Sequence, residues 1–241
     1  MRSWSPRSHR CARRALVFAL VAGAFAFVAP AIAAIPQTER DALLALYTST
    51  DGPHWRHPDR WNGAPGTECS WYRVVCDNDE THVILISLGD NALRGELPSL
   101  TALTELEAFI AYGNQLTGAP PSFSGMQRLE TIALGMNALS GPIPPMTDLP
   151  ALKVISFEFN HLTGSIPALD LPSLESFYVP GNELTGPLPS LAHAPNLDTF
   201  VVSGNALTGA LPSLAGLPRL TWLNVSYNQL SGHLPAAPTL D

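Results

Sequence analysis

Histidine side chains are the groups in this chain best suited to bind a metal ion or to transfer a proton near neutral pH. His54 and His57 stand three residues apart, a spacing that metal ligands use, but Pro53 and Pro58 beside them argue against a helix that presents both rings on one face. The other histidines are scattered along the chain and share no face. We therefore expect no metal site and no cofactor.

Carboxylate and hydroxyl groups do not form a recognisable catalytic motif either. The chain has no H-E-x-x-H, G-x-S-x-G or Walker motif. Glu107, Glu130 and Glu175 each follow a leucine at a regular place in the chain, which is typical of the solvated edge of a strand and not of an acid–base pair. We expect that the protein is not an enzyme.

An internal repeat determines the elements that position these groups. Seven asparagines follow one another at intervals of 23, 23, 23, 22, 23 and 23 residues, each with Leu two, Gly four and Pro seven positions later. Apolar residues precede each asparagine, as Leu129, Ile132 and Leu134 precede Asn137. This alternation predicts a short strand with one buried face, and the Gly and Pro exclude a long helix on the return path. Successive strands must then lie parallel in stacked coils.

The asparagines have a mechanical role in this interpretation. The chain turns sharply after each strand and leaves backbone N–H and C=O groups without sheet partners, which a short side-chain amide can satisfy. We expect a structural ladder rather than ligand contacts. Its members are Asn91, Asn114, Asn137, Asn160, Asn182, Asn205 and Asn228.

The string L-x-x-L-x-L-x-x-N-x-L-x-G-x-x-P, as in Leu129–Pro144, resembles the plant-type leucine-rich repeat from about Val83 to Pro235. The resemblance implies an α/β repeat fold, a right-handed solenoid with a concave parallel β-sheet and mostly extended or 3-10 return segments. Seven coils with a short C-terminal tail would occupy residues 83–241. The turns are slightly shorter than the plant pattern, which favours a bacterial relative.

The stretch before the repeats resembles the N-terminal cap of plant-type repeat proteins. Thr38 is positioned to cap a helix, and a turn-rich stretch then leads to Cys69–Cys76, with the sequence C-S-W-Y-R-V-V-C. Polygalacturonase-inhibiting proteins and receptor-kinase ectodomains have a similar cap, with Gly where this chain has Arg73. The resemblance implies a helical cap over residues 34–82 that covers the apolar end of the first coil.

The first 33 residues have the plan of a signal peptide. Five arginines and no acidic residue occupy the first fourteen positions, an apolar run spans 15–29, and the small-residue site Ala31-Ile32-Ala33 follows. The run is short for a membrane span, so we expect cleavage after Ala33, with an uncleaved anchor as the alternative. Cleavage predicts an exported protein that is periplasmic, extracellular or at the cell surface.

Removal of this segment changes the charge of the chain. The full sequence has 13 basic and 20 acidic residues, net −7, and loss of the five arginines leaves 8 against 20, net −12. A body this acidic offers no basic patch for phosphate backbones or anionic lipids. We expect no nucleic-acid partner and no stable membrane insertion after cleavage.

Two cysteines remain after cleavage, because Cys11 leaves with the signal peptide. Cys69 and Cys76 would reach an oxidising compartment without matching metal ligands, which favours a disulfide over a zinc site. We expect this disulfide to pin the helical cap.

The side chains that differ between coils lie on the exposed side of the predicted strands. Aromatic and sulfur-containing groups gather there over four adjacent coils, and charge is almost absent, which is typical of a binding hot spot. The alternative is that the rings only stack to cover the sheet. The predicted partner-binding residues of the concave face are Ile110, Tyr112, Met136, Glu158, Phe159, Tyr178, Val201, Trp222 and Tyr227.

These patterns predict a secreted, non-catalytic recognition module that binds a protein or peptide partner through the concave sheet. Two alternatives stay open: an inhibitor of a secreted cell-wall-degrading enzyme, and a structural surface or adhesin repeat protein. An uncharged sheet favours a neutral or hydrophobic peptide over polyanionic pectin and is poorly suited to an enzyme's charged cleft. A pull-down with the mature protein would separate these classes.

Overall fold

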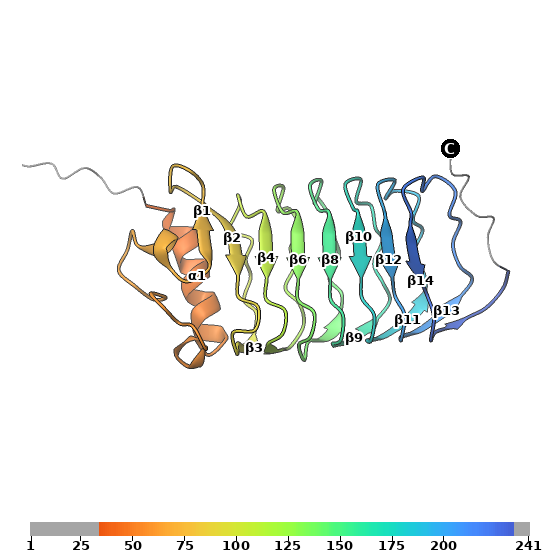
Figure 1. Ribbon diagram of the computed structural model, residues 1–241, viewed down its shortest axis with the longest axis horizontal. Helices are drawn as coiled ribbons and strands as arrows, with labels where there is room; N and C mark the ends of the chain where they lie inside the picture. Colours follow the sequence, from red (N-terminus) through yellow and green to blue (C-terminus); the bar gives the residue numbers. More distant parts are fainter. Residues whose placement is uncertain (1–33, 234–241) are drawn as a thin grey trace, which may run out of the picture. The chain divides into compact units, whose positions relative to one another are not determined.

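The computed structural model describes residues 34–233. Its main sheet has eight strands in which neighbours are successive coils of the repeat, seen side by side in Figure 1. β1 runs antiparallel to β2, and every later pair is parallel and in register. The main-sheet strands are β1 (Val74–Cys76), β2 (Val83–Ser87), β4 (Ala108–Ile110), β6 (Thr131–Ala133), β8 (Val154–Ser156), β10 (Ser176–Tyr178), β12 (Thr199–Val201) and β14 (Trp222–Asn224). We number the coils 1 to 7, from the one that contains β2 to the one that contains β14.

The predicted signal peptide, residues 1–33, and the tail from residue 234 lie outside the described residues, so cleavage after Ala33 stays a prediction. Within residues 34–233, no helix combines the length and the apolar character that crossing a membrane requires.

The apolar residues of the repeat fill the inside of the coils. The central residue of most main-sheet strands points inward and is fully buried, while its two neighbours stay partly exposed. This alternation confirms the predicted period of two and stabilises the stack because each coil buries its apolar side only against the next coil. These central residues are Ile86, Phe109, Ile132, Ile155, Phe177 and Phe200.

The return segments are extended, as expected, and they also pair with one another into further parallel sheets. One has five strands in the order β15-β13-β11-β9-β7, and the other pairs β3 with β5. Within residues 34–233 the 3-10 helices lie in the cap and not in the return segments. The return strands are β3 (Arg94–Glu96), β5 (Gln115–Thr117), β7 (Ser140–Pro142), β9 (His161–Gly164), β11 (Glu183–Pro187), β13 (Ala206–Gly209) and β15 (Gln229–Leu230).

The cap helix α1 spans Gln37–Ser49, and Thr38 does not cap it. Pro36 is the N-cap residue, no side chain caps the helix, and the backbone N–H groups of Glu39 and Arg40 donate to the Pro36 carbonyl. The expectation for Thr38 was wrong because the preceding proline starts the helix two residues earlier and needs no hydroxyl to do so.

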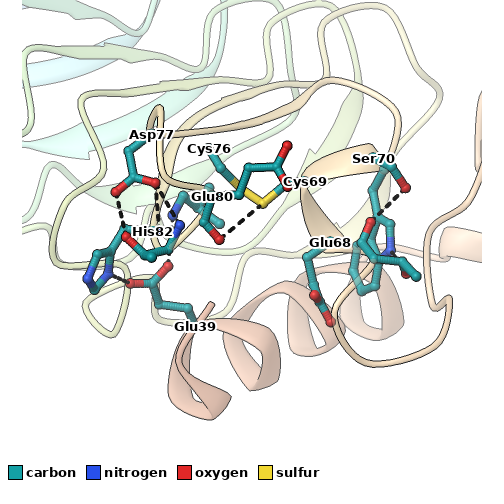
Figure 2. The surroundings of a disulfide bond; sticks show 12 residues. Glu39, Glu68, Cys69, Ser70, Cys76, Asp77, Glu80 and His82 are labelled. Carbon is teal, nitrogen blue, oxygen red and sulfur yellow. Dashed lines mark hydrogen bonds and ion pairs between the residues drawn. A yellow bond between two sulfur atoms is a disulfide. The ribbon is translucent and has the colours of Figure 1, made fainter. Parts of the chain in front are cut away.

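A disulfide and a group of aromatic rings hold the rest of the cap. Cys69 in the 3-10 helix η2 (Glu68–Ser70) is bonded to Cys76 at the end of β1, as Figure 2 shows. A second 3-10 helix, η1 (Gly52–His54), follows α1. Trp61 and Trp71 pack with centroids 5.2 Å apart. Arg73 has φ 61°, a left-handed conformation that glycine adopts more readily.

Candidate functional site

The exposed face of the main sheet carries most of the large apolar side chains that remain in contact with solvent. These are Tyr112, Met136, Phe159, Trp222 and Tyr227, and one more, Val75, lies in β1 of the cap. Because the strands are in register, residues at the same repeat position form a column across the sheet, with neighbouring residues about 4.8 Å apart. Within a column the backbone repeats from coil to coil, and the side chains differ.

The column directly before the ladder asparagines has left-handed backbone in every coil, because the chain turns sharply at the end of each strand. Coils 2, 5 and 6 place glycine there, the residue that tolerates this conformation at no steric cost. Coils 3, 4 and 7 place bulky apolar residues there instead, and coil 1 places an acid. The residues are Asp90 (φ 52°), Gly113 (66°), Met136 (55°), Phe159 (51°), Gly181 (66°), Gly204 (66°) and Tyr227 (54°).

The two glycines of coils 5 and 6 open a groove between Phe159 and Tyr227. Its volume is about 250 Å³. Phe159 borders it on the side of coil 4, and Trp222 and Tyr227 border it on the side of coil 7. The Phe159 ring leans over the first glycine, since a β-carbon on Gly181 would lie 2.7 Å from Phe159 Cδ1. The remaining lining residues are Tyr178, Pro180, Val201, Ser203, Gly204 and Asn224.

Comparison with known proteins agrees with this architecture. Residues 36–77 match the family described as the leucine rich repeat N-terminal domain, and residues 219–239 match the family described as the Leucine Rich Repeat. The chain is built of leucine-rich repeats. Together with the neighbours below, these matches support a plant-type leucine-rich-repeat protein.

Solved structures of plant proteins have the same fold. The plant peptide hormone receptor RGFR1 in complex with RGF2 is 32% identical over 63% of this chain and 25% of that chain, with a TM-score of 0.58. Pollen Receptor Kinase 3 is 27% identical over 73% of this chain and 88% of that chain, at 0.62. A plant ice-binding protein is 25% identical over 83% and 82%, at 0.57. This leucine-rich-repeat chain spans a quarter of the length of the hormone receptor chain.

The structure brings together only part of the predicted binding set. Five of the nine residues line the groove, namely Phe159, Tyr178, Val201, Trp222 and Tyr227. Val201 is only 3% exposed, because it lies at the bottom of the groove and not on an open surface.

The other four predicted residues lie on the cap side of the groove. The Tyr112 ring leans over Gly89 of coil 1, Glu158 accepts a hydrogen bond from Ser156, and Ile110 is half-buried. Met136 is exposed in coil 3. The prediction missed Pro180, Ser203, Asn224 and the two glycines. The replacement of a bulky residue by glycine at the same repeat position was the signal that could have found them.

The ladder asparagines lie between coils and point away from the groove. Asn160 accepts a hydrogen bond at Oδ1 from the backbone N–H of Leu139, and its Nδ2 donates to the carbonyl groups of Leu134 and Phe157 at 3.1 Å. The same pattern recurs in the neighbouring coils. Each side chain therefore joins its own turn to the coil before it.

Charged side chains lie outside the groove, at the edge of the sheet where the strands begin. Lys153 donates to Glu130 at 2.7 Å, and this hydrogen bond raises the pKa of the lysine, with smaller contributions from Glu175 and Glu107. No charged residue lines the groove itself.

The histidines singled out by spacing form no site. His54 contacts Asp51 at 2.6 Å, whereas the His57 ring stacks on Tyr72 with centroids 4.8 Å apart. Within residues 34–233, no three His, Cys, Asp or Glu side chains are grouped as metal ligands would be.

Proposed function

We propose that the mature protein is a secreted, non-catalytic recognition module, and that it binds a protein or peptide through the exposed face of the main sheet. The observation that carries this proposal is the uncharged groove between Phe159 and Tyr227, whose bordering rings are 58% and 87% exposed. Large rings held in contact with water beside a hollow of molecular size are typical of a binding hot spot.

The exposure of the rings argues against the alternative that they merely cover the sheet. Tyr227 shields almost nothing, because most of its surface faces solvent. Phe159 and Tyr227 also adopt left-handed backbone, which costs about 1–2 kcal/mol for a residue with a β-carbon. Glycine at the same repeat position removes this cost in coils 5 and 6. Phe159 and Tyr227 thus adopt a costly backbone conformation while their rings stay largely exposed. This supports a role for the two rings in contacts with another molecule.

The neighbours support the same class of function. The hormone receptor structure is described as a complex with RGF2, so a scaffold similar to this one is found together with a peptide. The partner of the present chain is a separate question, because the chain matches only a quarter of that receptor.

The test is a binding measurement on residues 34–241. Secreted peptides and proteins, cell-wall-degrading enzymes among them, are screened by biolayer interferometry against the wild type. Phe159→Ala should weaken a captured partner by about 2 kcal/mol, roughly 30-fold, with a much smaller change in the free energy of unfolding. Affinity should depend only weakly on salt, because no charge lines the groove.

A matched control lies on the return strands. Thr163→Ala also removes exposed atoms from coil 4, but on β9, and it should leave affinity unchanged. Affinity that collapses between low and moderate salt while Phe159→Ala is neutral would move the site to the acidic edge and refute the groove.

A second candidate function rests on the return strands and on the ice-binding neighbour. Thr163, Thr185 and Thr208 occupy the same repeat position in coils 4, 5 and 6 and are exposed. They are not directly opposite one another, because Thr163 pairs with Glu183 and Thr185 pairs with Ala206, so their methyl and hydroxyl groups form an oblique row that could order water. Thermal hysteresis measured with the mature protein, and lost in the Thr185→Tyr variant, would establish ice binding. Absence of hysteresis in the wild type would remove this candidate.

A further inference from the structure

The polar side-chain groups that line the groove differ in whether they donate or accept hydrogen bonds. Trp222 Nε1 and Asn224 Nδ2 can only donate hydrogen bonds. The one side-chain acceptor near them that is not a hydroxyl, Asn224 Oδ1, already accepts from the backbone N–H of Ser226 at 3.1 Å and from its hydroxyl at 2.7 Å. Neither donor has a partner among the described residues, and no carboxylate lines the groove. The hydroxyl groups of Tyr178, Ser203 and Tyr227 can donate or accept.

The shape of the groove restricts its occupant as well. It crosses four adjacent strands, from β8 to β14, which corresponds to three steps of about 4.8 Å, or about 14 Å. Aromatic rings border both ends, and the surface between them is formed by glycine, proline and valine together with Tyr178 and Ser203. An occupant must therefore be narrow, extended and apolar on two sides.

We propose that the groove binds a proline-rich segment in the polyproline II conformation. Rings of proline would pack against Phe159, Trp222 and Tyr227, and carbonyl oxygens would accept from Trp222 Nε1 and Asn224 Nδ2. Proline contributes a carbonyl acceptor and no N–H, which matches a groove whose two side-chain N–H donors have no partner while its amide oxygen is already occupied. At about 3.1 Å per residue, four or five residues fill the groove. This inference rests on the proposed function and names its ligand class.

Aromatic grooves suit such segments because a polyproline II helix is already extended before it binds and so loses little conformational entropy. A saccharide is the main competitor for an aromatic, uncharged site. Each sugar hydroxyl brings a donor, however, and the side-chain amide oxygen of the groove, Asn224 Oδ1, already accepts two hydrogen bonds. The balance of donors and acceptors therefore favours the proline-rich peptide.

The experiment uses residues 34–241 and a ten-residue oligoproline as the probe. Trp222 is 62% exposed, whereas Trp55, Trp61 and Trp71 are buried in the cap, so tryptophan fluorescence reports on the groove. Oligoproline should cause a saturable blue shift. An uncharged Gly-Ser peptide of the same length should cause none.

Three variants locate the site. Tyr227→Gly and Phe159→Gly reproduce the residue that coils 5 and 6 already carry, so they keep the turn while they remove the rings. Each should weaken oligoproline at least about tenfold, as expected for a central aromatic contact. Trp222→Phe keeps an aromatic ring but removes the N–H. By calorimetry it should weaken binding about fivefold, the loss of one hydrogen bond.

The matched control is Asp148→Gly. Asp148 has φ 55° and is exposed in a return segment, so the variant relieves the same backbone strain away from the groove. It should bind oligoproline like the wild type.

The outcomes separate this inference from the proposed function. No response to oligoproline, with a captured protein partner still lost in Tyr227→Gly, would overturn the ligand class and leave the recognition function standing. A response to cello-oligosaccharide but not to oligoproline would overturn it in favour of a saccharide. Equal oligoproline binding by wild type and Tyr227→Gly would remove the groove as the site. If the wild type binds neither oligoproline nor any screened protein, peptide or saccharide, both the ligand class and the proposed recognition function are refuted.

Discussion

At position 159 the chain carries a phenylalanine where its own fifth and sixth coils carry glycine. The left-handed backbone of that position comes from the turn that the ladder asparagine stabilises, and it is the same in all seven coils. A single side chain can therefore change the surface without changing the fold. Asp90, Met136 and Tyr227 occupy the same position in coils 1, 3 and 7, so the asparagine next to it fixes the backbone while the variable residue determines the surface.

Asn160 provides the test of that division of roles. Asn160→Ala should lower the free energy of unfolding by roughly 1–3 kcal/mol, because the buried N–H of Leu139 loses its acceptor and three carbonyl groups of coils 3 and 4 each lose one of their donors. Urea denaturation measures the change. His161→Ala, which alters the exposed neighbour, should stay within about 0.5 kcal/mol of wild type. An unchanged unfolding curve for Asn160→Ala, together with lost ligand binding, would assign that column to recognition.

At the scale of elements, the cap helix is joined to the first coil by a buried carboxylate. Glu39 of α1 accepts hydrogen bonds from His82 Nδ1 at 2.6 Å and from the backbone N–H of Val83 at 2.9 Å, as Figure 2 shows for His82. On the other side of His82, Asp77 accepts from its backbone N–H and from Thr81. One of the two hydrogen bonds that Glu39 accepts here therefore comes from a titrating ring.

The hydrogen bond with Glu39 raises the pKa of His82 above its ordinary 6.5. A raised pKa means that the folded state binds the proton more tightly than the unfolded state. The stability that this pair contributes is complete below pH 6.5 and is lost as the pH rises through the higher folded-state pKa. Unfolding free energy measured by urea from pH 5 to pH 9 should therefore fall over that window in the wild type.

His82→Gln supplies the comparison for the pH series. The variant should show a flatter profile over the same window, because its amide does not titrate. Asp77 does not confuse the result, since the backbone and hydroxyl of Thr81 lower the pKa of Asp77 below 3.8, outside the range tested. Parallel pH profiles for wild type and variant would show that the His82–Glu39 contact does not contribute to stability.

The disulfide acts on another part of the cap, where it joins η2 to β1. Cys69 and Cys76 close a short loop, with a sequence separation of 7, so reduction should cost roughly 2–3 kcal/mol of unfolding free energy. Denaturation with and without reductant measures the difference, and the Cys69→Ser, Cys76→Ser double variant should match the reduced protein. Unreduced mature protein should yield no alkylated thiol by intact mass. Two alkylatable thiols would contradict the assignment.

At the scale of the whole molecule, the repeat made most of the architecture predictable. Spaced leucines such as Leu129 and Leu134 determine both strand and core, because a period of two has only one buried face. The pairing of return strands was not predicted, since each of them buries a single apolar residue, such as Leu162 or Leu184, and so short an alternation does not mark a strand in the sequence. The groove was missed for another reason: it depends on absent side chains at Gly181 and Gly204, and a search for conspicuous residues does not find a hollow.

The last described coil has a consequence for affinity. No residue from 218 to 233 is buried, and the inward positions Leu223 and Val225, which correspond to fully buried residues in earlier coils, stay partly exposed. A coil with so little burial among the residues that the structure describes should open at low free energy. Yet Trp222, Asn224 and Tyr227 of this coil border the groove. Part of the binding energy of a ligand is then used to keep coil 7 closed, so larger apolar side chains at positions 223 or 225 should lengthen the residence time of the ligand without contacting it.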